Sequence, residues 1–541
     1  MYWVIEGDAV PRLPWFTRAN AGETMPDPVT PLGWTLLWDR ALLPGWAKGN
    51  VSFGCLRAEE VAGDPRCMAA VFGGYFYLNL SAVRMVGVRM PGATVEAIDH
   101  GLFGSDPSLP PYVPQDGDES PECTALLTER IGWVLGADRW DELDERHAAA
   151  GKARSTRPDL ATCTDAELVA RARSLDTVCE DLYELHVWTG LSCAVAYGAL
   201  VAAATERGSA EAVNDLIAGL GDVESAAPVL AMWDLSRLPA PSPEFDAAFR
   251  DFLAEHGGRG LGDWDLSSPS WELAPERALL LVDRLRAVGP DAAPRAHGAA
   301  AAERREALAA DLLAGDDGAL RTALRATGFF VRMRERSRGG LIIGMNEIRM
   351  PIHELARRCH RRGDLDHAED LFLLLDAELD GFLADPAAHR VVLEERRTTY
   401  RSLFELRPPY FTRDRIRLED LPPRGTADVA PAPAGTVIQG VSGAARGQVT
   451  GRARVLADPY DQRGLAPGDV LIARQTDPTW TPLFVDAAAV VVDFGSPMSH
   501  AVIVGRELDT ICVVSAENAS LRIPDGATVL VDGTAGTVTV L

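Results

Sequence analysis

The clearest hydrophobic pattern lies near the end of the chain, where residues 487–492 (AAAVVV) form an unbroken apolar run with β-branched side chains. A run of this length predicts a buried strand, which the Phe-Gly pair at 494–495 would end. A helix is expected next, with Ser496 as its N-cap and Pro497 in its first position, because apolar residues then recur at helical spacing. This pattern places His500 in the first turn of a helix.

A histidine at a helix N-terminus faces unpaired backbone N–H groups and the positive end of the helix dipole. That field disfavours imidazolium, so the ring of His500 is expected to stay neutral and nucleophilic near pH 7. The same N–H groups would stabilise a phosphate carried on the ring. From position alone a plainer role stays open, in which His500 caps a helix or fills a small gap.

Helical periodicity dominates the middle of the chain. The predicted helices cover residues 124–140, 164–204, 210–220 and 299–313, with a further helix beginning at Ser242. Residues 104–122, rich in Pro, Gly and Ser, are expected to form an exposed loop. The apolar stretch 191–204 is too short to span a bilayer, so a buried helix is expected there.

Residues 422–435 (PPRGTADVAPAPAG) have the composition of a semi-extended linker. The linker separates a substrate-binding region over residues 1–421 from a domain over residues 436–541. We expect a multidomain α+β fold, with a mostly helical body, short N-terminal strands and a C-terminal β/α domain. The linker would span at most about 45 Å when fully extended, enough for a rigid domain to swing between distant sites.

The charge balance excludes some classes of partner. With 53 basic against 78 acidic residues, the net charge is -25, the wrong sign for a general binder of nucleic acid or anionic membranes. Eight scattered cysteines contain no C-x-x-C pair, so neither a disulfide framework nor a thiolate zinc site is indicated. The N-terminus lacks a signal-peptide pattern, and a cytoplasmic protein is expected. No metal site is expected either, because Gly363 interrupts the spacing of the histidines at 353, 360 and 367.

The segment GSPMSHAVIVGREL, residues 495–508, resembles the phosphohistidine motif of phosphoenolpyruvate-utilising enzymes, broadly G-G-x-x-[ST]-H-x-A-I-x-A-R-E-x-G. This family includes phosphoenolpyruvate synthase, pyruvate phosphate dikinase and rifampin phosphotransferase. The departures from the motif are Ser496, Val502, Gly505 and Asp509. The resemblance implies that the C-terminal domain is a swivelling domain and that His500 is its catalytic phosphate carrier. It also implies phosphate-supporting roles for Ser496, Ser499, Arg506 and Glu507.

Residues 17–38 (TRANAGETMPDPVTPLGWTLLW) resemble the start of the substrate-binding region of rifampin phosphotransferase-like proteins, where the region follows an ATP-grasp domain. The chain has no G-x-x-x-x-G-K-[ST] loop, and its Gly-rich run 257–262 follows a helical pattern instead of a strand. We therefore expect a separate ATP-grasp protein to charge His500, an arrangement similar to phenylphosphate synthase. ATP and Mg²⁺ would act through that partner, with no cofactor bound permanently.

Three further residues are candidates for substrate binding. Arg259 lies in HGGRG, which resembles the family's G-[HM]-R-G segment, although Gly258 replaces the usual His or Met. Arg336 lies in the basic segment 332–349, which resembles an R-E-x-x-R segment of the family. His186 precedes the apolar stretch and would line an aromatic pocket. Ordinary alternatives stay open: Arg259 paired with a carboxylate beside a helix cap, Arg336 on a solvated helix face, and His186 in the core.

These expectations describe a dikinase-like phosphotransferase component. His500 would take a phosphoryl group from the ATP-charged partner and pass it to a hydroxyl of a small organic molecule bound by the helical body. Two other functions remain possible. In the first, the chain binds and sequesters a small molecule while carrying a vestigial histidine domain; in the second, it is an enzyme that uses the helical pocket without phosphorylation.

Overall fold

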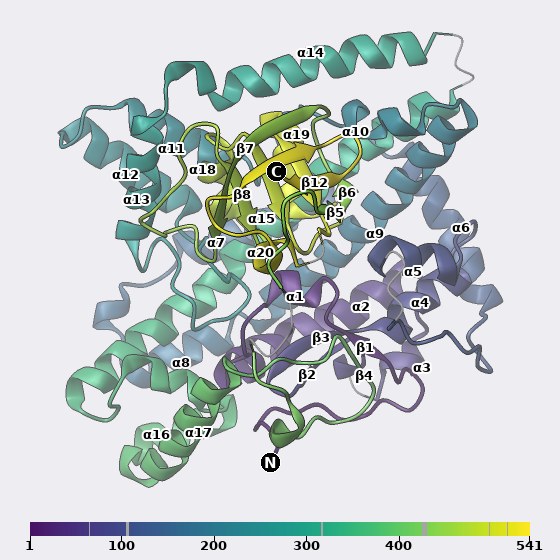
Figure 1. Ribbon diagram of the computed structural model, residues 1–541. Helices are drawn as coiled ribbons and strands as arrows, with labels where there is room; N and C mark the ends of the chain where they lie inside the picture. The colour runs from purple at the N-terminus through teal and green to yellow at the C-terminus, as the bar shows by residue number, and fades with distance from the viewer. Residues whose placement is uncertain (64, 104–107, 315–317, 425–429, 497, 517) are drawn as a thin grey trace.

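The computed structural model describes residues 1–541 except 64, 104–107, 315–317, 425–429, 497 and 517 (Figure 1). A helical body and a small N-terminal sheet form one part of the molecule, and a larger sheet near the C-terminus lies between this part and helix α14 (Pro294–Leu312). The predicted multidomain α+β fold, with short N-terminal strands and a C-terminal β/α domain, is confirmed.

The N-terminal sheet joins segments from both ends of the helical region. Its strands are β1 (Phe16–Thr17), β2 (Ala69–Phe72), β3 (Tyr75–Asn79) and β4 (Phe411–Thr412), in the order β2-β3-β1-β4. Gly73 and Gly74 turn the β2–β3 hairpin with φ of 57° and 84°, values that favour glycine. Phe16 pairs with both Asn79 and Thr412, so two segments almost 400 residues apart lie side by side.

The helical body is built around two long helices, α9 (Asp176–Glu206) and α15 (Ala319–Arg362), which pack against each other. Helix α2 (Leu43–Phe53) packs on α9, while α7 (Asp141–Ser155) and α8 (Asp165–Arg173) pack on α15. Residues Gly33–Leu42 form a π-helix that brings Trp38 into the same core. Other helices of the body are α1 (Ala21–Thr24), α3 (Ala58–Val61), α4 (Leu80–Arg89), α5 (Val95–Phe103), α6 (Pro121–Gly136), α10 (Val213–Leu216), α16 (Leu379–Ala384) and α17 (Arg390–Leu403).

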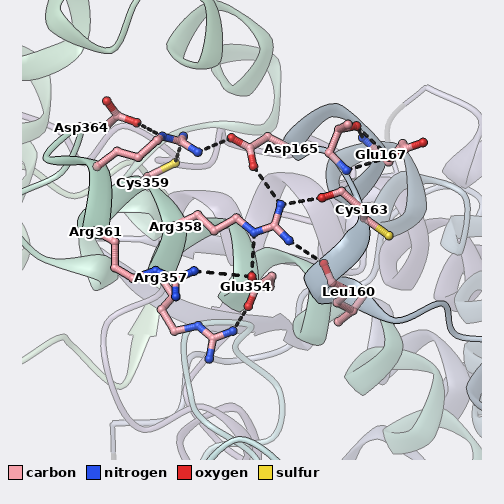
Figure 2. Close-up of polar contacts among 12 residues, drawn as sticks. Leu160, Cys163, Asp165, Glu167, Glu354, Arg357, Arg358, Cys359, Arg361 and Asp364 are labelled. Atoms are coloured by element: carbon pink, nitrogen blue, oxygen red, sulfur yellow. Dashed lines mark hydrogen bonds and ion pairs between the residues drawn. The ribbon is translucent and has the colours of Figure 1, made fainter.

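Arginines fasten the C-terminal end of α15 to α8 and the turn before it (Figure 2). Arg358 donates to Glu354 at 2.6 Å and to the carbonyl oxygens of Leu160 and Cys163 at 2.6 Å each. Arg362 pairs with Asp165 at 2.7 Å. Charged groups held by several partners in this way fix the position of a helix, and α15 carries residues of the site described below.

The C-terminal sheet has the order β5-β12-β11-β7-β8-β9-β10-β6. Its strands are β5 (Val437–Gln439), β6 (Val441–Ser442), β7 (Gln448–Leu456), β8 (Val470–Ala473), β9 (Ala489–Val492), β10 (Ile511–Val514), β11 (Thr528–Asp532) and β12 (Thr537–Val540). Strands β7 to β10 pair in parallel, and α19 (His500–Leu508) connects β9 to β10. All four residues of β9 are buried, as the apolar run predicted. Short helices α18 (Thr481–Phe484) and α20 (Ala519–Arg522) complete the domain.

A shared hydrophobic core holds this domain on the helices that precede α15. These helices are α11 (Ala227–Arg237), α12 (Pro243–His256), α13 (Pro275–Ala287) and α14. Leu483 and Phe484 of α18 and Val502 of α19 belong to the same buried cluster as Val229 and Leu281. The C-terminal domain therefore packs on the rest of the protein through an apolar surface as well as through polar contacts.

Several predicted boundaries differ from the structure. The predicted loop 104–122 is irregular where it is described, but α6 already begins at Pro121. Ser242 caps α12 as predicted, since its hydroxyl accepts from the Phe245 N–H. The stretch 210–220 is helical only to Leu216, because three residues of the following turn, at 219, 221 and 222, have positive φ.

The apolar stretch 191–204 belongs to the longer helix α9 and is buried on one face only. Leu200 and Ala204 are buried, whereas Ala194 and Gly198 are exposed. Within the described part of the chain, one helical stretch, Asp165–Glu206, would be long and apolar enough to cross a membrane by length and composition alone. Since α9 packs against α2 and α15, it has the position of a core helix.

Candidate functional site

His500 is the first residue of α19, directly after strand β9 and a short turn. The N-cap is Ser499, so the prediction of Ser496 for that position is wrong; the two serines are three residues apart, and the chain turns once more before the helix begins. Ser496 stabilises this turn, because its hydroxyl accepts from the Met498 N–H at 3.3 Å. Pro497, predicted at the first helical position, lies outside the described residues.

The turn before α19 requires a glycine. A Cβ at Gly495 would lie 2.9 Å from Cβ of Val514 and 3.1 Å from Oγ of Ser499. Any larger residue would push the turn away from β10 and move the N-terminus of α19. Gly495 therefore fixes where the His500 ring lies.

The His500 ring is 6% exposed and lies between two threonine hydroxyls. Oγ1 of Thr476 is 3.4 Å from Nδ1, and Oγ1 of Thr481 is 3.3 Å from Nε2. Burial lowers the pKa of His500 well below its usual value, and the positive charges of Arg338, Arg259 and Arg334 lower it further. The imidazole is therefore neutral near pH 7, which leaves a ring nitrogen lone pair available as a nucleophile.

His500 lines a cavity of about 680 Å³ between the C-terminal domain and the helical body. This volume is in the range of sites that enclose a drug-sized molecule. Its apolar wall consists mainly of aromatic side chains: Trp38, Trp46, Phe76, Tyr183, Trp264, Tyr400, Phe404 and Trp480. Such a wall favours a ligand with a flat or extended apolar part.

Charged side chains lie in the same cavity. Arg334 and Arg338 of α15 line it, and Nε of Arg338 is buried with no hydrogen-bond partner among the described residues. Asp477 also lines it, and burial raises the pKa of this carboxyl to about 6. The Gly262 N–H of the body donates to Asp477 at 3.4 Å, so this carboxyl contacts both sides of the interface. The cavity thus brings the neutral His500 together with cationic and acidic side chains.

Arg259 lies near His500 but is absent from the cavity wall. Its side chain is buried, Nη1 has no hydrogen-bond partner in the part of the chain that the structure describes, and its charge lowers the pKa of His500. Gly258, which replaces the usual His or Met, faces α15: a Cβ there would lie 3.3 Å from Cβ of Asn346. Asn346 therefore fills the space that the Cβ of the family's larger residue would enter at position 258.

The other two predicted substrate-binding residues have different positions. His186 lines the cavity, and its Nδ1 is 3.0 Å from Oγ of Ser337. Burial and the charges of Arg334 and Arg338 lower the pKa of His186 to about 3, so it is neutral at pH 7. Arg336 does not line the cavity, because it points to the opposite side of α15 and pairs with Asp144 at 2.9 Å.

Of the residues predicted to support phosphate, Ser496 and Ser499 line the cavity and Arg506 and Glu507 do not. Oγ of Ser499 is buried, and no described residue forms a hydrogen bond with it. At the other end of α19, Glu507 accepts from the backbone N–H groups of Leu220 and Gly221 at 2.9 and 3.0 Å.

Arg506 also contacts the helical body. Its side chain donates to Oδ1 of Asn214 at 2.6 Å, and its carbonyl oxygen accepts from the Gly219 N–H at 3.1 Å. In this arrangement Arg506 and Glu507 hold the C-terminal domain on the body, and neither side chain lines the cavity.

Two of the histidines at the spacing interrupted by Gly363 contact different backbone carbonyl oxygens. His353 Nε2 is 2.8 Å from the carbonyl oxygen of Leu266, and His360 Nδ1 is 3.2 Å from that of Leu365. The latter contact lies beside Gly363, which ends α15 with a φ of 80° as the sequence suggested. These ring nitrogens contact backbone carbonyl oxygens.

Sequence reasoning missed Thr476, Thr481 and Asp477. They belong to the segment ARQTDPTWTP, residues 473–482, which begins at the last residue of β8. A signal was present, since polar residues directly after a buried parallel strand lie at the edge of the sheet where ligands bind. The same edge carries the turn after β9, which is why these side chains surround His500.

Two family models match parts of the chain. Residues 465–536 match the mobile domain of PEP-utilising enzymes, and residues 236–343 match the fourth domain of rifampicin phosphotransferase. The first match contains His500 and its two threonine neighbours, and the second contains Arg259, Arg334 and Arg338. The predicted resemblance to the phosphoenolpyruvate-utilising enzymes is confirmed by these matches.

Individual relatives cover different shares of the chain. An uncharacterised protein of Mycobacterium tuberculosis is 28% identical over 98% of this chain and 62% of its own length. A rifampicin phosphotransferase of a Streptomyces species is 30% identical over 57% of this chain and 36% of its own. A prodigiosin synthesizing transferase of Serratia marcescens is 31% identical over 54% of this chain and 33% of its own. The chain therefore spans less than two thirds of the length of these curated relatives.

Proposed function

We propose that this chain is the acceptor-binding and phosphate-carrying part of a phosphotransferase. His500 would pass a phosphoryl group to a hydroxyl of a small organic molecule held in the aromatic cavity. One observation carries the proposal: the neutral His500, at the N-terminus of a nine-residue helix, opens into the same cavity as Arg334 and Arg338. Relatives named as phosphotransferases support the same class of reaction.

The chemistry would proceed in two steps. First, a ring nitrogen of His500 attacks a phosphoryl group, a P–N bond forms, and the bond to the leaving group of the donor breaks. Then the acceptor hydroxyl oxygen attacks phosphorus, the P–N bond breaks, and the ring nitrogen recovers its lone pair. Arg334 and Arg338 are placed to neutralise the charge of the phosphoryl group. Asp477, with its pKa raised to about 6, is placed to take the hydroxyl proton.

The first step needs a second position of the C-terminal domain. With His500 6% exposed against the acceptor cavity, a bulky donor would compete with the acceptor for the same space. We propose that an ATP-grasp unit outside these 541 residues, on a separate protein, binds ATP with Mg²⁺. Movement about residues 422–435 would carry His500 between the two sites.

The proposal is tested by incubating the purified chain with a candidate ATP-grasp partner and ATP labelled at the β position. We expect acid-labile label on the wild-type chain and none on His500→Gln. His100→Gln is the matched control, because His100 is exposed and lies outside the cavity lining, and it should label like the wild type. No label on the wild-type chain, under conditions in which the partner binds ATP, would contradict the carrier role and favour a sequestering protein.

A further inference from the structure

A second group of arginines lines the same cavity, away from the charges that surround His500. Arg474 follows strand β8 and Arg424 stands at the start of the linker, and both line the cavity; Arg18 follows β1 and is not a lining residue. The pKa of His500 responds to Arg338, Arg259 and Arg334, whereas that of Arg474 responds to Arg424. The cavity thus has two separate positively charged sites.

These three guanidinium groups differ in how many of their N–H donors already form hydrogen bonds. Arg18 is buried and donates to the carbonyl oxygens of Phe76, Met25 and Pro26 at 2.7, 3.3 and 3.2 Å. It supplies charge and holds the wall, but it has few donors left for a ligand.

Arg424 and Arg474 have donors left over. Arg424 donates through Nε to the Leu406 carbonyl oxygen at 3.2 Å and through Nη2 to the Tyr75 hydroxyl at 3.1 Å. Its Nη1 makes no hydrogen bond to a described residue. The Arg474 guanidinium lies 5.5 Å from the centroid of the Phe494 ring, and among the described residues it has no hydrogen-bond acceptor. Both side chains are half-buried and line the cavity.

The arginines also exceed the nearby negative charge. Two described carboxylates act on Arg474, those of Asp27 and Asp493. Asp493 is already engaged, since it accepts from the backbone N–H and the hydroxyl of Ser520, and burial raises its pKa to about 6. Burial and the charge of Arg424 lower the pKa of Arg474, as expected for cations without enough counter-charge.

We propose that Arg424 and Arg474 bind an anionic group, a carboxylate or a phosphate, that belongs to the acceptor. Unused guanidinium donors in a half-buried, positively charged place are suited to such a group. The inference rests on the proposed function, because it assigns the anion to the molecule whose hydroxyl meets His500. The acceptor would then be an amphipathic compound: a hydroxyl beside His500, an apolar middle against the aromatic wall, and an anion at the second arginine pair.

The two arginines come from opposite sides of the interface. Arg474 is carried by the C-terminal domain, whereas Arg424 is fixed to the helical body, where its N–H donates to the carbonyl oxygen of Glu405 at 2.6 Å. The anion site is therefore complete only while the domain is docked at the cavity. A bound acceptor would join both parts and stabilise the position in which His500 faces the hydroxyl.

Two matched probes test this site without any phosphate transfer. The anionic probe is 6-hydroxy-2-naphthoate, and the neutral probe is 2-naphthol. Their binding is measured by the quenching of tryptophan fluorescence, because Trp38, Trp46, Trp264 and Trp480 line the cavity. We expect the wild-type chain to bind the naphthoate roughly tenfold more tightly than naphthol, as charge-assisted hydrogen bonds predict.

Variants assign the preference to the arginine pair. Arg424→Gln and Arg474→Gln should lose the preference for the naphthoate and keep the affinity for naphthol, which also shows that the cavity is intact. Arg474→Lys should retain part of the preference, because the charge remains. Arg463→Gln is the control: Arg463 is exposed, pairs with Asp461 and Asp525, and does not line the cavity. It should behave like the wild type.

The inference would be overturned if the wild-type chain bound both probes equally or bound neither. It would also be overturned if the preference for the naphthoate survived in both glutamine variants. Displacement of the naphthoate by an equal concentration of inorganic phosphate would overturn the assignment of the anion to the acceptor. Failure of the carrier role is seen separately: it appears as unlabelled His500 in the ATP experiment, which does not depend on naphthoate binding.

Discussion

The two ends of helix α19 contact different parts of the protein. At its N-terminal end, Ser499 and His500 line the cavity. At its C-terminal end, Arg506 and Glu507 face the helical body and bind α10 and the turn after it. One nine-residue helix therefore carries both His500, the proposed phosphate carrier, and the contacts that hold the domain where this residue meets the cavity.

This difference separates two roles within one motif. A phosphohistidine motif invites the view that all its polar residues contact phosphate, yet here chemistry and docking are about two helical turns apart. Between them, Gly505 keeps α19 close to the sheet, because a Cβ there would lie 3.0 Å from Cβ of Ala444. A rigid helix transmits the docking contact at one end to the position of the ring at the other.

The largest effect of changing the cavity end is expected for Arg338→Gln. Loss of this cation should slow the transfer from phosphorylated His500 to an acceptor roughly 100-fold, the usual cost of removing one group that stabilises transition-state charge. The measurement is single-turnover loss of label from His500, with a hydroxyl acceptor chosen for its thermal stabilisation of the chain.

Arg336→Gln is the matched control for that experiment. Arg336 lies two residues away on the same helix, but it pairs with Asp144 outside the cavity. It should transfer at the wild-type rate. Equal slowing by both substitutions would mean that Arg338 acts through the helix and not through the cavity.

The docking end is probed by Glu507→Gln. A carboxylate accepts from both the Leu220 and Gly221 N–H groups, whereas an amide offers one oxygen to the two donors. We expect the amides of Leu220 and Gly221 to exchange with deuterium roughly 10- to 100-fold faster, since hydrogen bonds to charged groups contribute about 1.5–3 kcal/mol.

Glu306→Gln controls for a change of charge near the same interface. Glu306 lies on α14, which packs on α19, but its side chain is exposed and pairs with Arg305. The amides of Leu220 and Gly221 should exchange at the wild-type rate in this variant. Unchanged exchange in Glu507→Gln as well would show that Glu507 does not hold the domain.

The sequence predicted the reactive end of α19 better than its surroundings. The apolar run before residue 493 and the helical spacing after it were local signals, and they located His500 correctly in the first turn. The N-cap was placed on Ser496 because two serines three residues apart offer the same local chemistry. Which of them begins the helix depends on the contact of Gly495 with Val514, a neighbour on the next strand.

The choice among the arginines of α15 shows a second limit. Residues 334 and 338 are four apart and share one face of the helix, while residue 336 lies on another face. Both faces of α15 contain buried residues, so the sequence pattern does not say which one meets the cavity. The sequence therefore points to Arg336, whereas Arg334 and Arg338 are the arginines of this segment that line the cavity. The contact of Asn346 with Gly258 also depends on packing between distant segments, and local patterns do not contain it.

The smallest expected effect is on the pH dependence of docking. This dependence would link the protonation of His500 at one end of α19 to the docking contacts at the other end. When the domain leaves the cavity, the His500 ring meets water and its pKa returns toward the usual value of about 6.5. In the docked position burial and the charges of Arg338, Arg259 and Arg334 lower this pKa. The docked form therefore binds fewer protons, so docking is weakened as pH falls below about 6.5 and is unaffected by His500 above it.

Asp477 acts in the opposite direction. Its pKa is raised to about 6 in the docked form, so its contribution is fully present at low pH and is lost as pH rises toward 6. The Asp477 effect is present in both the wild-type chain and His500→Gln. The difference in the pH dependence of docking between these two proteins is therefore the contribution of His500. At pH 5.5 this difference has an upper limit of about tenfold for a ring whose undocked pKa is about 6.5.

Amide exchange at Leu220 and Gly221 reports this equilibrium, because both N–H groups are protected by Glu507 only while the domain is docked. After correction for intrinsic exchange rates, acidification from pH 7.5 to 5.5 should reduce protection several-fold more in the wild-type chain than in His500→Gln. An identical pH profile in the two proteins would mean that the ring has the same pKa in both positions of the domain. In that case the cavity end and the docking end of α19 would not be coupled through His500.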